Sequence, residues 1–355
     1  MKVFKNANIK GEITDIIIDD GKFVSFQKTS EEGIDLKGAE VIPGMVDIHT
    51  HGCLGFDPTD DIEKLEEMSD FFAKNGTTTW YPTTLTVSME KLKKAVSVDI
   101  SNIKGANIPG FHMEGPFISS KKLGAMNGKY VIKPDAEVVN ALEQVKIINI
   151  APEVDGAIEF IENCNAVVCL GHTVADYDTA VKAAKAGAKC LTHTFNAMPP
   201  FLHREPSLIG AAVTEDLYAQ VISDGVHIHP AAVLGLYKML GSDRMILISD
   251  CISATGVTDN GEIMFGGKKA FIVDGICRNE EGALNGSTTV LYKCVKKAIE
   301  FGIEKYEAIK MATETPSKLM GINKGRLEVG FDADFLIIDD NMNIIDTVIG
   351  GEIYI

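Results

Sequence analysis

The chain has 355 residues, of which 45% are hydrophobic and 24% charged, and its formal net charge is −16. This composition is typical of a folded protein with a substantial core, and the acidic balance argues against a nucleic-acid partner, which needs a clustered basic surface. Seven scattered cysteines without a CxxC motif predict a reduced protein, and the N-terminus shows no apolar signal segment, so we expect a cytoplasmic location. No run approaches the roughly 20 apolar residues of a membrane-spanning helix, so a membrane location is not expected.

The two ends of the chain have the same sequence pattern. Both consist of short β-type runs separated by Gly and Asp-Gly. We therefore expect a small, discontinuous β-sandwich domain built from both termini, residues 1–43 and 326–355. The residues between them, 44–325, are expected to form a second, larger domain.

Between the ends, apolar strand-like runs alternate with helix-compatible stretches, which predicts parallel strands. Eight such runs can be counted: MVDIHT, TTTWYPT, IPGFHME, VKIINIA, AVVCLGH, AKCLTHT, YAQVISD and MILISD. Eight strands are what a closed (β/α)8 barrel of TIM type requires. The predicted fold class is α/β, a (β/α)8 barrel with the small β domain beside it.

Polar residues lie at the ends of six of these runs. They are His49 and His51, Glu114, His172, His193, Asp224 with His227, and Asp250. In such a barrel the C-terminal strand ends form the active-site face, so these side chains should converge on one cavity.

The HxH pair has the spacing of two ligands. Residues two apart on a strand share a face, so His49 and His51 point the same way. Two neutral imidazoles on one face are natural ligands for a divalent ion. A hydrogen-bonded pair of core histidines is the alternative.

Three other residues form a second candidate ligand set. Gly and Pro follow Glu114 directly and end its strand, while His172 and His193 each close an apolar run. One carboxylate and two imidazoles make an open metal site with room for water. The alternative for each residue alone is a polar strand cap.

Asp250 ends the strongly apolar run MILISD, which would bury its carboxylate. Beside a metal site such a carboxylate is suited to act as general base and then acid; otherwise it caps the next loop. Asn196 and Ala197, Arg204, and residues 283–288 are further candidate ligand contacts on loops, although each of them is also an ordinary loop residue.

The motifs PGMVDIHTHG, FHMEGPF, GHT, THTFNAM, DGVHI, LISDCISATG and LNGS occur in order between about residues 43 and 290. Together they resemble the N-acetylglucosamine-6-phosphate deacetylases of the amidohydrolase superfamily. The resemblance implies removal of acetate from N-acetyl-D-glucosamine 6-phosphate in amino-sugar catabolism. It also implies metal ligation by Glu114, His172 and His193, and catalysis by Asp250.

The resemblance further implies substrate contacts and an assembly. The contacts map onto Ala125, Met126, Asn196, Ala197, Arg204, His227, Leu284, Asn285 and Gly286. Similar proteins are homodimers in which the arginine matching Arg204 reaches the phosphate in the partner's site. Local positive charge from Arg204 and His227 would explain how an acidic protein holds an anion.

Two features vary within the family, the HxH pair and the residue at position 126. Some relatives lack the HxH histidines and hold one ion, whereas this chain keeps both, so a second ion (Zn, Fe, Mn or Co) at His49 and His51, bridged by Glu114, is a further expectation. Some relatives carry a polar side chain where this chain has Met126, which cannot donate a hydrogen bond. We hypothesise that an ion held by the HxH pair takes over the polarising role.

Two alternative functions fit the sequence less well. A different amidohydrolase, such as a dihydroorotase-like cyclic amidase or an acyl-amino-acid hydrolase, usually bridges two metals through a carboxylated lysine, and here no lysine ends an apolar run in the right region. A non-catalytic barrel retained as a scaffold predicts degraded ligands, whereas all candidate ligands and Asp250 are present.

Overall fold

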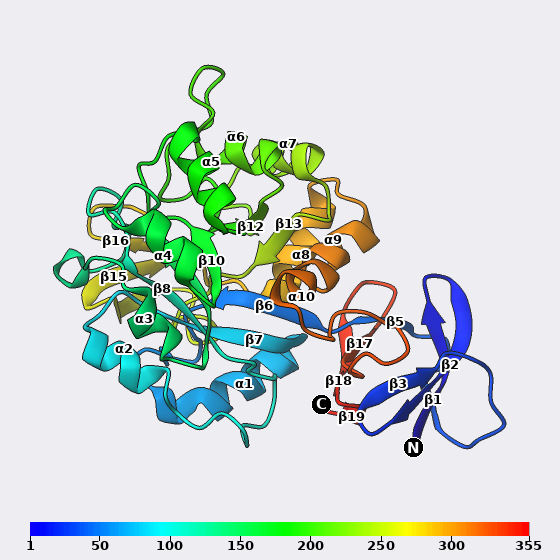
Figure 1. Cartoon of the computed structure of the whole chain (residues 1–355). Helices are drawn as coiled ribbons and strands as arrows, with labels where there is room; N and C mark the ends of the chain where they lie inside the picture. Colours follow the sequence, from blue (N-terminus) through cyan, green and yellow to red (C-terminus); the bar gives the residue numbers. More distant parts are fainter. Residues whose placement is uncertain (355) are drawn as a thin grey trace.

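The computed structural model describes residues 1–354, which form an α/β barrel with a small β domain beside it (Figure 1). The barrel strands are β6 (Met45–Thr50), β7 (Thr77–Thr84), β8 (Phe111–Phe117), β9 (Val145–Ile150), β10 (Val167–Leu170), β11 (Cys190–Leu191), β12 (Tyr218–Ile222) and β13 (Met245–Ile248). They pair in parallel in chain order. The predicted eight-stranded barrel is confirmed.

Most residues of the barrel strands are buried on both faces, with Lys146 of β9 as an exposed exception, which is why these strands read as near-continuous apolar runs. In β13, Ile246 and Ile248 pack with the residues inside the barrel, while Met245 and Leu247 pack in the layer beneath the helices. The alternation follows from the two-residue period of a strand.

Ten helices are found in the described part of the chain, mainly around the barrel. They are α1 (Leu65–Lys74), α2 (Met89–Ala95), α3 (Ala136–Asn140), α4 (Ala157–Asn163), α5 (Tyr177–Ala186), α6 (Ser207–Thr214), α7 (Pro230–Leu240), α8 (Leu291–Glu300), α9 (Lys305–Met311) and α10 (Glu314–Met320), with short 3-10 turns at Ile62–Lys64 and Gly128–Tyr130. Side-chain caps mark where several of these helices begin. At the start of α5, the Asp176 side chain accepts a hydrogen bond from the main-chain amide of Thr179. Within residues 1–354, no helix has both the length and the apolar character needed to cross a membrane.

The barrel closes between β6 and β13, at the residues expected to carry function. The amide of Asp250 donates to the carbonyl of His49 over 2.9 Å, and the amide of His51 donates to the carbonyl of Cys251 over 2.7 Å. The seam therefore holds the HxH histidines beside Asp250.

The small β domain contains both chain ends (Figure 1). Its strands are β1 (Lys2–Ile9), β2 (Glu12–Asp19), β3 (Lys22–Ser25), β4 (Ile34–Asp35), β5 (Glu40–Pro43), β17 (Phe335–Ile338), β18 (Ile344–Ile349) and β19 (Glu352–Ile353), joined in one mixed sheet. The rings of Phe4, Phe23 and Phe335 meet in its core. A small domain built from both termini was predicted and is confirmed.

A third sheet was not predicted. It consists of the antiparallel strands β14 (Gly261–Phe265), β15 (Lys268–Val273) and β16 (Ile276–Asn279), inserted after β13. Its buried residues pack against Leu85, Ile118 and Met126, next to the carboxyl ends of the barrel strands. The insertion thus covers part of the face where the candidate site lies.

Candidate metal and active site

Two groups of potential metal ligands lie side by side at the carboxyl ends of the barrel strands. His49, His51 and Glu114 form one group, and Glu114, His172 and His193 form the other. Within each group the ligand atoms lie within 4.8 Å of one another, and every member is buried. The structure therefore brings together all five predicted ligands, with Glu114 common to both groups.

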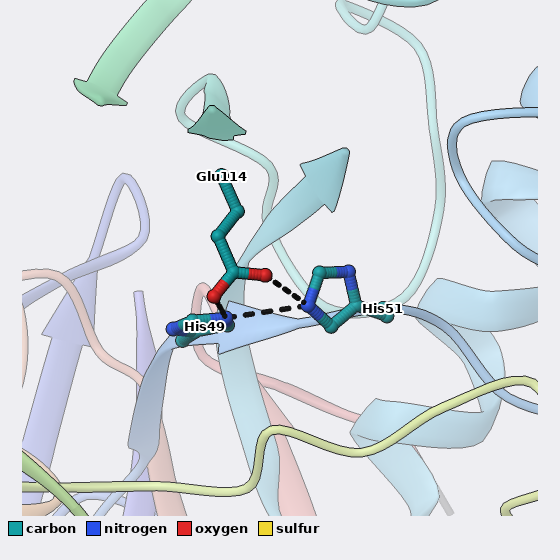
Figure 2. A group of neighbouring side chains, drawn as sticks. All are labelled: His49, His51 and Glu114. Carbon is teal, nitrogen blue, oxygen red and sulfur yellow. Dashed lines mark hydrogen bonds and ion pairs between the residues drawn. The ribbon is translucent and has the colours of Figure 1, made fainter. Parts of the chain in front are cut away.

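The two carboxylate oxygens of Glu114 have different nearest imidazoles. Its Oε1 lies 2.8 Å from Nε2 of His193 and 3.1 Å from Nε2 of His172. Its Oε2 lies 2.9 Å from Nε2 of His51, and Figure 2 shows the carboxylate above the HxH pair. One carboxylate therefore contacts both pairs of imidazoles, as a bridging ligand would.

The spacing of the nitrogens fits a cation. The Nε2 atoms of His49 and His51 are 3.3 Å apart, and those of His172 and His193 are 3.0 Å apart. Bonds of ~2.0–2.1 Å in a tetrahedral zinc site place two ligand nitrogens about 3.3 Å from each other. When both nitrogens of a pair carry lone pairs they repel, and a cation between them removes that repulsion; without a cation, a proton on one of the two nitrogens can be shared as a hydrogen bond.

Hydrogen bonds from the opposite ring nitrogens orient two of these imidazoles. Nδ1 of His51 lies 3.0 Å from the Thr83 carbonyl, and Nδ1 of His172 lies 2.8 Å from the Lys122 carbonyl. A carbonyl only accepts, so each Nδ1 carries the proton and each Nε2 offers its lone pair to a metal. The residues present therefore fit a metal centre, although their geometry does not select one element.

The ionisable groups of the site depend on one another. Against the effect of burial, the charge of His49 and hydrogen bonds from His172 and His193 hold the pKa of Glu114 well below its usual range. Also against burial, the charges of Glu114 and Asp250 raise the pKa of His49 to about 10. A cation that binds at His49 therefore competes with a proton.

Asp250 lies beside both HxH histidines. Its Oδ1 is 3.5 Å from Nε2 of His49 and 3.5 Å from Nε2 of His51. The backbone of Asp250 is left-handed, with φ 46°, as are those of His172 (φ 47°) and His193 (φ 26°). Left-handed backbone in non-glycine residues is costly and is concentrated at functional sites, where it aims side chains that a regular strand would not.

A cavity of about 440 Å³ opens above these groups. Of the predicted site residues, its walls contain His51, Ala125, Met126, Glu114, His172, His193, Asn196, Ala197, His227, Asp250, Leu284 and Gly286. The volume suits a small ligand such as a phosphorylated monosaccharide. His227 is oriented there by Asp224, whose Oδ2 is 2.7 Å from its Nδ1.

Three predicted residues do not line this cavity. His49 is fully buried but belongs to a ligand group, and Asn285 is buried, with its amide donating to the Cys277 carbonyl over 3.1 Å. Arg204 is exposed on the loop before α6 and lines a different hollow with Tyr177 and Glu205. Within a single chain Arg204 is thus outside the cavity.

Sequence reasoning did not name several residues of the cavity wall. Lys121 and Lys122 precede the predicted Ala125 and Met126 in one loop and add positive charge to the wall. Phe265, from the unpredicted sheet, lies with its ring centroid 5.7 Å from that of His51. The adjacent lysines were visible in the sequence, whereas the position of Phe265 depended on the missed insertion.

Comparisons with known proteins agree on one family. The amidohydrolase family model matches residues 41–354. The chain is 34% identical over 333 residues to the N-acetylglucosamine-6-phosphate deacetylase of Bacillus subtilis, covering 88% of this chain and 84% of the relative. It is 31% identical to the enzyme of that name from Bos taurus, covering 95% of this chain and 89% of the relative.

Solved structures give the same picture. The deacetylase of that name from Pasteurella multocida superposes with a TM-score of 0.91 at 29% identity, covering 99% of each chain. A mutant of the Mycobacterium smegmatis enzyme, in complex with N-acetyl-D-glucosamine-6-phosphate, superposes with a TM-score of 0.91 at 28% identity, covering 100% of this chain and 99% of the other.

Proposed function

Because this chain belongs to the amidohydrolase family and, within it, to the N-acetylglucosamine-6-phosphate deacetylases, we infer that it hydrolyses the acetamide of N-acetyl-D-glucosamine 6-phosphate. The products are acetate and D-glucosamine 6-phosphate. The observation that carries this inference in the structure is the position of Glu114, shared by two imidazole pairs, with Asp250 beside one of them in a cavity of monosaccharide size.

We propose that Glu114, His172 and His193 hold one divalent ion and that His49 and His51, with the second oxygen of Glu114, hold another. The distances around Glu114 support this division, because its Oε1 is nearest to Nε2 of His193 and its Oε2 lies 2.9 Å from Nε2 of His51. Nε2 of His49 lies 3.4 Å from Oε1, so the carboxylate contacts members of both groups. A divalent ion in such a site supplies a Lewis acid that polarises a carbonyl and makes water more acidic. Zn, Fe, Mn and Co all accept this mixture of nitrogen and oxygen ligands.

Asp250 is proposed to carry the proton in both halves of the reaction. Amide hydrolysis needs a base that removes a proton from the attacking water and an acid that protonates the departing amine. The carboxylate lies at the cavity wall, and its Oδ1 is 3.5 Å from the Nε2 atoms of His49 and His51. A single group can therefore accept the proton and then deliver it within the same enclosed space.

The walls of the cavity are proposed to select the sugar and its phosphate. Asn196, Ala197, Leu284 and Gly286 line the space beside the ligands, together with Ala125 and Met126. His227, held by Asp224, presents its Nε2 side to an anion. We propose that the phosphate lies at His227.

Arg204 is proposed to complete the phosphate site from a second subunit. In its own chain it is exposed and outside the cavity, and the loop between β11 and α6 projects from the barrel (Figure 1). A homodimer would bring one subunit's Arg204 to the partner's phosphate, where a guanidinium forms strong, charge-assisted hydrogen bonds. We also propose a cytoplasmic location, since all seven cysteines are free.

One experiment tests the activity directly. Acetate release is measured with N-acetylglucosamine 6-phosphate and with unphosphorylated N-acetylglucosamine, before and after a chelator and metal add-back. We expect hydrolysis that prefers the phosphorylated sugar, disappears with the chelator and returns with the ion. Equal rates on both sugars would refute the phosphate site, and activity unaffected by the chelator would refute the metal site.

A further inference from the structure

We propose that Gln220 is a positioning residue that fixes the tautomer of His49 and thereby makes the HxH pair a ligand set for a second ion. This inference rests on the proposed metal-dependent function and adds a residue to it. Gln220 lies in the middle of β12 with no exposed surface, between the buried residues Ala219 and Val221. A buried carboxamide is costly unless hydrogen bonds satisfy it.

The hydrogen bonds of Gln220 define which way its amide points. Its Oε1 lies 2.9 Å from Nδ1 of His49 and 3.4 Å from the main-chain nitrogen of His193, while its Nε2 lies 3.8 Å from Sγ of Cys169. The main-chain N–H of His193 can only donate, so the atom that faces it must be the oxygen. The same oxygen must then accept from His49.

The tautomer of His49 follows from this contact. A proton on Nδ1 leaves the Nε2 lone pair free, and Nε2 points toward His51 at 3.3 Å and Glu114 Oε1 at 3.4 Å. The ring cannot swing to another acceptor, because it is fully buried and packs edge-on against the His112 ring at 4.6 Å between centroids. Gln220 therefore aims the lone pair into the ligand group.

Gln220 also offers an experimental handle on one ligand group alone. Main-chain carbonyls orient His51 and His172, and no substitution removes those. Without its acceptor, the buried Nδ1–H of His49 would be unpaired, and the tautomer protonated on Nε2, which cannot ligate, becomes favoured. Loss of such an outer partner typically weakens metal binding 10- to 100-fold. The longer contact with His193 should matter much less.

The test uses Zn²⁺ alone as the probe and no sugar. Metal-stripped wild-type protein, Gln220→Leu, Gln220→Met and Gln220→Glu are titrated with Zn²⁺ against a chromophoric chelator. Cys169→Ala serves as the control, because it removes the thiol partner of the Gln220 Nε2 and leaves the contacts of Oε1 in place. Thermal unfolding of each stripped protein reports folding, and Gln220→Met keeps the length of the side chain in case Gln220→Leu does not fold.

We expect two ions in wild-type protein, one of them bound about 10- to 100-fold more weakly in Gln220→Leu and Gln220→Met. Gln220→Glu retains an acceptor and should bind both ions, as should Cys169→Ala. A single ion in wild-type protein, equal weakening of both ions, or unchanged binding in folded Gln220→Met would overturn the proposal. Two ions bound as expected by a protein that leaves the phosphorylated sugar intact would refute the activity and leave the role of Gln220 standing.

Discussion

Replacing Asp250 by asparagine isolates the proton-transfer step from the shape of the site. Asp250 has a left-handed backbone with φ 46°. Asparagine enters this region readily, whereas alanine would add strain of ~1–2 kcal/mol. The carboxylate is 3.5 Å from each HxH nitrogen, at the limit of hydrogen bonding, so the amide loses little direct contact. The main change is the loss of a base.

The size of the effect follows from the role. A positioned acid or base contributes about 10²–10⁴-fold, which corresponds to about 2.7–5.4 kcal/mol in the barrier. Asp250 is proposed to serve in both proton transfers, so Asp250→Asn should lower kcat by about 10³-fold or more. KM and metal content should change little, because the cavity wall and ligand groups remain.

The assay is steady-state acetate release from N-acetylglucosamine 6-phosphate, with elemental analysis of the same samples. Cys251→Ala is the matched control, because Cys251 is the next residue but its Sγ faces Thr50 and Gly52 rather than the cavity. A kcat for Asp250→Asn within tenfold of wild type, at unchanged metal content, would refute the assignment. Loss of the metal would instead show that Asp250 is a ligand.

Because the pKa of His49 is raised to about 10, its proton stabilises the fold fully below pH 6.5, and this contribution is lost as pH rises through about 10. An ion that binds at His49 at pH 7.5 should therefore release about one proton. Calorimetry in two buffers of different ionisation enthalpy measures the number of protons released, and a value of zero would contradict the prediction. Arg204→Ala should raise KM for the phosphorylated sugar about 10- to 100-fold, as expected for lost charged hydrogen bonds, and leave KM for the unphosphorylated sugar unchanged; an equal effect on both sugars would exclude a phosphate contact. Gly286→Ala should lower kcat and destabilise the protein by about 1–3 kcal/mol, because the new Cβ would lie 2.5 Å from Ile252 Cγ2 and 2.9 Å from the Asp250 carbonyl oxygen. In Gly282→Ala, which has a similar φ but nothing within 4 Å of the new Cβ, the thermal midpoint and kcat should change less.

The barrel was predictable because each of its buried strands appears in the sequence as a short apolar run. A parallel strand with both faces covered reads as a short apolar run, and a polar residue that closes such a run lies at the carboxyl end of the barrel. Glu114, His172 and His193 were found this way, although 79 residues separate Glu114 from His193. The predicted strand order brings these distant residues together, because consecutive parallel strands of a barrel are neighbours.

Two features were missed for different reasons, one because its contacts are distant in the sequence and one although its turns are visible there. Gln220 is a single polar residue in mid-strand, and its partner His49 is 171 positions away. The β14–β16 sheet did leave a signal, since Gly266–Gly267 and Asp274–Gly275 are hairpin turns between alternating runs. Only the eight barrel strands were counted in the sequence, so the sheet and, with it, Phe265 were missed.

The remaining question is what polarises the acetyl carbonyl. Met126 lines the cavity, but its Sδ accepts from the Thr86 amide over 3.3 Å, and a thioether has no proton to donate. An oxyanion needs donors or a cation aimed at it. His51 belongs to the second ligand group and also forms part of the cavity wall. The retained HxH pair and the non-donating Met126 therefore fit one hypothesis. A second ion held by the HxH pair would polarise the acetyl carbonyl, which Met126 cannot do. Elemental analysis that finds one ion in each fully active subunit would contradict this reasoning.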